Sequence, residues 1–100
     1  MIQRILNTIF SSLSKGSLLH KPKSTSTILD ISQTVGIKYS IGNNGNNKTI
    51  SINEIISAAT IISQNGYITQ QEVSNIINPH KPCNKTSLIA VLKQSGLSVI

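Results

Sequence analysis

The stretch "SINEIISAATIISQNGYITQQEVSNII", residues 51–77, decides how the fold is organised. It contains two Ser/Thr-x-x-Glu patterns: Ser51 with Glu54, and Thr69 with Glu72. In such a capping box, the hydroxyl and the carboxylate each accept a hydrogen bond from a backbone N–H at the start of a helix. Apolar residues at helical spacing follow both patterns, so we predict helices over about 52–63 and 70–77. Asn65-Gly66 is predicted to form the turn between them.

The same turn also fits part of an EF-hand calcium loop. With Gly66 at the sixth position, Ile68 and Glu72 fall at the eighth and twelfth positions, as that loop requires. The first position is then Ile61, which has no ligating oxygen, and the loop holds a single carboxylate. A second frame over residues 43–54 places a lysine where the glycine should be. We therefore interpret the stretch as a turn and a capped helix, without bound metal.

Strands are predicted upstream of this stretch and one more helix downstream. Residues 35–41, "VGIKYSI", alternate between apolar and polar side chains, which predicts a half-buried strand. The Gly/Asn-rich run 42–47 predicts a turn and 48–52 a second short strand, giving a hairpin. Downstream, a loop with two prolines leads to a last helix that ends at about Ser95. Asn84, or one of the two residues after it, is expected to cap this helix.

Two short motifs in residues 52–100 carry a family resemblance. Gly66-Tyr67-Ile68-Thr69 is a glycine-containing turn before a helix that opens with threonine, and Leu92 to Leu97, "LKQSGL", matches Leu-x-x-x-Gly-Leu. In these motifs the sequence resembles winged-helix and other helix-turn-helix DNA-binding domains. It departs from them in a connection of about seven residues between the second and third helices and in lacking a second wing strand. No arginine lies in the expected binding surface.

The resemblance and the predicted elements together define the expected fold class. We expect an α+β fold that is mainly α, with an amphipathic N-terminal helix and a short β-hairpin or strand. A three-helix, winged-helix-like unit over residues 52–97 then completes the chain.

The last helix is expected to be the one presented to the major groove. One side of its helical projection is apolar. The other side carries small and polar residues of the kind a recognition helix needs: Thr86, Ser87, Ala90, Lys93 and Gln94. Gln94 is expected to pair with adenine, Lys93 with guanine or phosphate, and Lys81 and Lys85 with backbone phosphates. The alternative is that this side of the helix is an ordinary solvated surface.

The N-terminal segment, residues 1–27, has two interpretations. Residues 2–13 carry apolar side chains at helical spacing, and 17–27 form a Ser/Thr/Lys stretch that we interpret as a linker before a globular domain at 28–100. The helix either packs on that domain or belongs to a targeting segment, because the segment is amphipathic, basic, serine-rich and free of acids, like a mitochondrial presequence. Secretion signals of some bacterial injection systems have a similar composition.

The net charge of the chain indicates which classes of partner it could bind. Nine bases oppose three acids, giving +6, and residues 1–27 carry four of the bases without an acid. Such a balance suits phosphate in nucleic acid or at an anionic membrane, and the alternative is that it only keeps the chain soluble. We expect either a small helix-turn-helix-like DNA-binding or regulatory protein, or a non-enzymatic interaction or effector-type protein with an N-terminal targeting or secretion segment. The corresponding partners are DNA or a protein.

The sequence lacks the residues that several classes of function require. Cys83 is the only cysteine, so no intrachain disulfide can form. His80 and Cys83 fall short of the four ligands of a zinc site, and the three carboxylates are scattered, so we expect no metal, cofactor or enzymatic activity. No apolar run reaches the ~20 residues of a membrane-spanning helix. We expect a cytoplasmic location, with mitochondrial targeting or non-classical export as the alternative.

Overall fold

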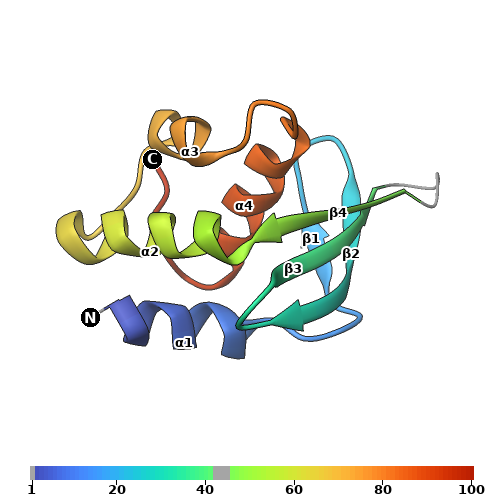
Figure 1. Ribbon diagram of the computed structural model, residues 1–100, viewed down its shortest axis with the longest axis horizontal. Coiled ribbons are helices and arrows are strands. Elements are labelled where there is room, and N and C mark those ends of the chain that lie inside the picture. The colour runs from blue at the N-terminus through green and yellow to red at the C-terminus, as the bar shows by residue number, and fades with distance from the viewer. Residues whose placement is uncertain (1, 42–45) are drawn as a thin grey trace.

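The computed structural model describes residues 2–41 and 46–100, which are ordered as one helix, four strands and three helices (Figure 1). The elements are α1 (Ile2–Ser12), β1 (Leu18–His20), β2 (Thr25–Ser32), β3 (Gly36–Ile41), β4 (Asn46–Ser51), α2 (Ile52–Asn65), α3 (Gln70–Ile76) and α4 (Cys83–Gln94). The strands form one antiparallel sheet in the order β1-β2-β3-β4. The sheet therefore has two edges, β1 and β4.

The expected fold class is wrong. A four-stranded sheet, and not a single short hairpin or strand, separates α1 from the last three helices, so the chain is not a mainly α protein with a three-helix winged-helix-like unit. The missed strands are β1, which lies in the supposed linker, and β2. In β2 the inward position 26 is a serine, and a bulge between Ile28 and Asp30 interrupts the two-residue alternation. Both features conceal a strand from a search for alternating apolar residues.

The expected strands at 35–41 and 48–52 correspond to β3 and β4, although β4 begins earlier, at Asn46. Most of the predicted turn at 42–47 lies outside the described residues. Gly36 opens β3 with a φ of 133°, and a Cβ atom there would collide with the carbonyl oxygen of Ile50 in β4. Glycine at this position therefore allows β3 and β4 to approach each other closely.

Both predicted capping boxes are confirmed. At the start of α2, Ser51 Oγ accepts from the Glu54 backbone N–H at 3.2 Å, and the Glu54 carboxylate accepts from the Ser51 N–H at 2.9 Å. Thr69 and Glu72 make the same exchange at the start of α3. Gly66 ends α2 in the left-handed conformation, as expected for an Asn-Gly turn. Local sequence is sufficient to place these two helices.

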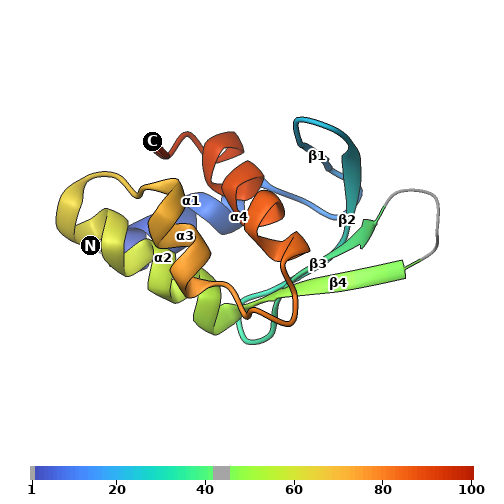
Figure 2. The same ribbon diagram turned by 90° about the horizontal axis from the view of Figure 1, so that it is seen from above.

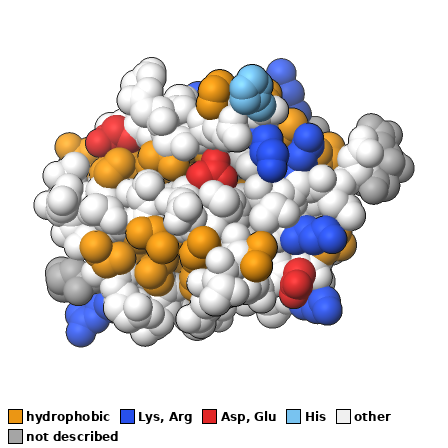
Figure 3. Space-filling view, in the orientation of Figure 1, with side chains coloured by type: hydrophobic (Ala, Val, Ile, Leu, Met, Phe, Trp, Pro, Cys, Tyr) orange, Lys and Arg blue, Asp and Glu red, His pale blue; other side chains and the backbone are white. Residues whose placement is uncertain are grey.

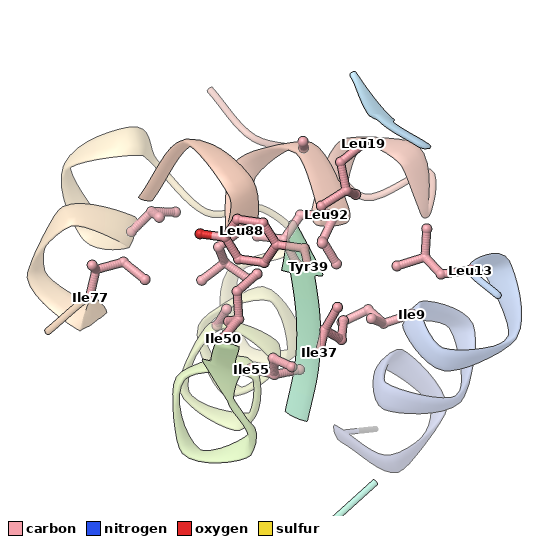
Figure 4. Packing of buried hydrophobic residues seen from close by; sticks show 14 of the residues in the cluster. Ile9, Leu13, Leu19, Ile37, Tyr39, Ile50, Ile55, Ile77, Leu88 and Leu92 are labelled. Atoms are coloured by element: carbon pink, nitrogen blue, oxygen red, sulfur yellow. The ribbon is translucent and has the colours of Figure 1, made fainter. Parts of the chain in front are cut away.

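Residues from every helix and strand contribute to the hydrophobic core (Figure 4). Its fully buried side chains include Ile9 of α1, Leu19 of β1, Tyr39 of β3, Ile55 of α2 and Leu88 of α4. Figure 4 shows side chains from these elements converging on a shared interior. Since Ile9 is completely buried, α1 packs as an integral part of the folded protein.

Helix α4 packs against the sheet and contacts both edge strands, β1 and β4 (Figure 2). Near its start, Asn84 Nδ2 donates to the backbone carbonyl of Thr49 in β4 at 2.9 Å. At its end, Gln94 Oε1 accepts from the His20 N–H at 2.7 Å, and Gln94 Nε2 donates to the Leu18 carbonyl at 2.9 Å. Two side-chain amides therefore satisfy backbone groups that the sheet leaves unpaired at its edges.

The prediction that Asn84 or one of the two residues after it caps α4 is wrong. Pro82 occupies the N-cap position, and no side chain makes a capping hydrogen bond there. The Asn84 amide instead faces the interior, where it also accepts a 2.6 Å hydrogen bond from the Tyr39 hydroxyl. After α4, the end of the chain runs alongside the segment that precedes α3. Val99 and Ile68 form an isolated parallel β-bridge there.

Candidate nucleic-acid interface

The residues expected to contact DNA occupy different environments. Ser87 is completely buried and Ala90 is only 5% exposed, so neither can approach a base. The remaining residues are exposed or half-buried: Lys81, Lys85, Thr86, Lys93 and Gln94. A helical projection of the sequence misses this burial because it gives α4 a single buried side, whereas the hairpin also contacts the predicted polar side at Gln94 and Ser87.

Gln94 is exposed but its amide is already engaged. Both its oxygen and its nitrogen are hydrogen-bonded to the backbone of β1. Pairing with an adenine edge requires the same two groups. The expected adenine contact would therefore cost the attachment of β1 to α4.

A hollow of about 430 Å³ lies between the β1–β2 hairpin and α4. Its basic lining residues are His20 from the hairpin and Lys85 and Lys93 from α4, with Thr86 between them on the helix. Gln70, at the start of α3, lines it as well. Three elements that are distant in sequence therefore meet around this hollow.

A second hollow of about 460 Å³ adjoins the first, because Pro22 and Thr86 line both. Lys21, Lys23 and Cys83 also line the second hollow. We call the two hollows together the basic groove. Four of the nine lysines and arginines line this groove with one histidine, and no carboxylate among the described residues does so.

Lys21 attaches the hairpin to the interior beneath the groove. Its ammonium lies 5.3 Å from the centroid of the Tyr39 ring and 3.4 Å from Ser87 Oγ. Burial lowers the pKa of Lys21, and burial raises the pKa of Tyr39. Stacking on an aromatic face stabilises a partly desolvated cation. Lys21 is thus engaged within the protein, whereas Lys23 is exposed at the hairpin tip.

The hairpin residues were not predicted as site residues. His20, Lys21 and Lys23 fall in the stretch interpreted as a linker. The excess of bases over acids in residues 1–27 is the sequence feature that could have indicated them. Their position opposite α4 depends on a contact across more than sixty residues of chain, which no local pattern specifies.

The described part of the chain contains neither a metal-ligand cluster nor a helix that could span a membrane. No group of three His, Cys, Asp or Glu side chains there could hold a metal ion. Across residues 2–41 and 46–100, no helix is long and apolar enough to cross a membrane. Cys83 is exposed and unbridged.

Comparison with protein-family models, with curated proteins and with solved structures found no match. The resemblance to winged-helix domains therefore rests on the short motifs alone.

Proposed function

We propose that this chain is a small, non-enzymatic nucleic-acid-binding protein that contacts phosphates through the basic groove. One observation carries the proposal. Residues 20–23 and 85–93, which are far apart in sequence, bring four lysines and a histidine together around two adjoining hollows. Among the described residues, no acid shares this lining to repel a phosphate backbone.

The chemistry of the groove suits backbone contacts better than base recognition. Lysine is a compact charge that attracts phosphate without a fixed geometry. Base reading in the major groove relies on bidentate side chains such as arginine, asparagine and glutamine. The groove has no arginine among its described lining residues, and its Gln94 is occupied by β1. We therefore expect binding with little dependence on base sequence.

Salt dependence of binding tests the proposal. Fluorescence anisotropy is measured with labelled mixed-sequence DNA, single-stranded and duplex, at several salt concentrations. Each phosphate contact adds about 0.7–0.9 to the slope of log affinity against log salt, because binding releases counterions. We expect Lys85→Ala with Lys93→Ala to reduce this slope by about 1.4–1.8 and to weaken binding at low salt.

The control changes the same net charge elsewhere. Lys15→Ala with Lys38→Ala removes two exposed lysines that do not line the groove. This pair should retain most of the affinity and the slope. A flat response to salt, or equal losses in both double variants, would contradict the proposed site.

Protein binding is the second candidate, and exposed apolar side chains favour it. Ile2 is 37% exposed, Ile56 38% and Val35 63%. Figure 3 shows hydrophobic side chains gathered along the seam between α1 and α2, while most lysines and arginines on that face lie toward the strands and the start of α4. An apolar band beside a basic half is a surface that a protein partner could use. A targeting role for residues 1–27 would require α1 to leave the core.

A further inference from the structure

We infer that the basic groove accepts a single strand of nucleic acid in preference to a duplex. The inference rests on the proposed function and specifies its ligand. It concerns the shape of the groove, the spacing of its charges and the side chains at its surface.

The shape of the groove decides against insertion of α4 into a duplex. A helix that reads DNA must protrude, because it has to enter a major groove about 12 Å wide. Here α4 is flanked by His20 and Pro22 of the hairpin on one side and by Gln70 of α3 on the other, all lining the same hollow. Ala90, between these flanks, is only 5% exposed. The surface is therefore recessed, and the ligand has to enter it.

The spacing of the charges favours an extended anion. Lys85 and Lys93 are eight residues apart on one helix, or about 12 Å along its axis. Lys23 lies beyond the residues shared by the two hollows, Pro22 and Thr86. A chain of phosphates running along α4 and past the hairpin tip can meet all three lysines. A duplex can reach such a recess only with the part of its backbone nearest the rim.

The side chains at the surface predict how the strand is held. His20 is the one aromatic side chain that lines the groove among the described residues, because no Phe, Tyr or Trp does so and Tyr39, which lies beneath Lys21, is completely buried. Stacking, which contributes about 1–3 kcal/mol per base in many single-strand binders, is therefore limited to the imidazole ring of His20. Pro22, Ile41 and Ile89 offer apolar contact only. Binding should be weak, insensitive to sequence and steeply dependent on salt.

Competition between the two forms of DNA tests the inference. A labelled oligonucleotide of about 12 nucleotides, within the usual range of single-strand sites, is compared with its own duplex. We expect the single strand to bind about tenfold more tightly, a difference of about 1.4 kcal/mol. Lys85→Ala with Lys93→Ala should remove most of this affinity, and Lys15→Ala with Lys38→Ala should not.

The single cysteine provides a second measurement without altering the lysines. Cys83 is exposed and lines the second hollow, so a bulky neutral maleimide attached there should obstruct the groove. We expect the modified protein to lose most of its single-strand affinity. The Cys83→Ser variant, treated with the same reagent, should bind as the unmodified protein does. Equal binding before and after modification would overturn the inference.

The outcomes separate the inference from the proposed function. Lysine-dependent binding that is equal or tighter for the duplex overturns the inference and leaves the proposed function in place. If neither form binds in a lysine-dependent way, both fail. Binding to phosphatidylserine vesicles that needs Lys85 and Lys93, without binding to either oligonucleotide, would assign the groove to a membrane surface and also overturn both.

Discussion

Asn84 shows how much one buried side chain contributes to this structure. It is completely buried, accepts from the Tyr39 hydroxyl at 2.6 Å, and donates to the Thr49 carbonyl at 2.9 Å. A side-chain amide here connects α4 to β3 and β4 at once. An asparagine in an Asn-rich sequence therefore has a structural role that composition does not reveal.

Replacing Asn84 should destabilise the protein strongly. Asn84→Leu keeps a similar shape but removes the acceptor of the Tyr39 hydroxyl and the donor to the Thr49 carbonyl, which should cost about 2–4 kcal/mol of unfolding free energy. Urea denaturation measures the loss. Asn75→Leu, at an exposed position on α3, is the matched control and should change stability by less than about 0.5 kcal/mol.

A double-variant cycle identifies the cause of this loss. If the unpaired hydroxyl contributes, Tyr39→Phe should cost less in the Asn84→Leu background than in the natural protein, because its hydrogen bond is already lost. Additive effects of the two substitutions would show that the 2.6 Å hydrogen bond contributes little.

At the scale of the elements, the short strand β1 depends on contacts outside its own sequence. It has only three residues, pairs with β2 along one side, and has its other side closed by the Gln94 amide. A strand this short is marginal without further contacts. The position of the hairpin, and with it one wall of the groove, thus depends on a glutamine at the far end of the chain.

Gln94→Ala should loosen β1 with little effect on the whole fold. The His20 N–H loses its partner, so its hydrogen exchange should become about tenfold faster, corresponding to about 1.4 kcal/mol of local protection. Because Gln94 is exposed, global stability should fall by less than about 1 kcal/mol. Lys93→Ala is the control, since it removes a neighbouring side chain without touching this contact. Unchanged exchange at His20 would mean that the Gln94 contact does not hold β1.

The elements also differ in how far sequence predicts them. Helices α2 and α3 are predictable because Ser51 with Glu54 and Thr69 with Glu72 satisfy backbone groups within four residues. The pairing of β1 and β2 could not be predicted, since residue 26 is a buried serine and β1 has a single buried position, Leu19. The lysines of α4 were predicted as site residues, but their hairpin counterparts were not.

At the scale of the whole molecule, α1 distinguishes the two interpretations of residues 1–27. The helix either packs on the domain or belongs to a targeting segment. Its Ile9 is completely buried in the shared core and Leu13, just after the helix, is 6% exposed. Deleting a buried isoleucine side chain costs about 2–5 kcal/mol. That is a large part of the total stability of a small domain, typically about 5–15 kcal/mol.

We therefore expect Ile9→Ala to reduce the unfolding free energy by about 2–4 kcal/mol in urea denaturation. Arg4→Ala, at an exposed position on the same helix, should change it by less than about 0.5 kcal/mol. If both variants are as stable as the natural protein, α1 does not belong to the folded core in solution. That result would support the alternative in which α1 belongs to a targeting segment.

By itself, the sequence determined the features that depend on neighbours along the chain: two capped helices, the Asn-Gly turn and the excess of positive charge. Capping and turn formation involve groups a few residues apart, so a short segment specifies them. The tertiary structure decided that α4 is covered by β1, that Ser87 and Ala90 are buried, and that Lys23 and Lys93 line one groove. These outcomes depend on which distant surfaces meet, and packing against the sheet decides that only when the whole chain has folded.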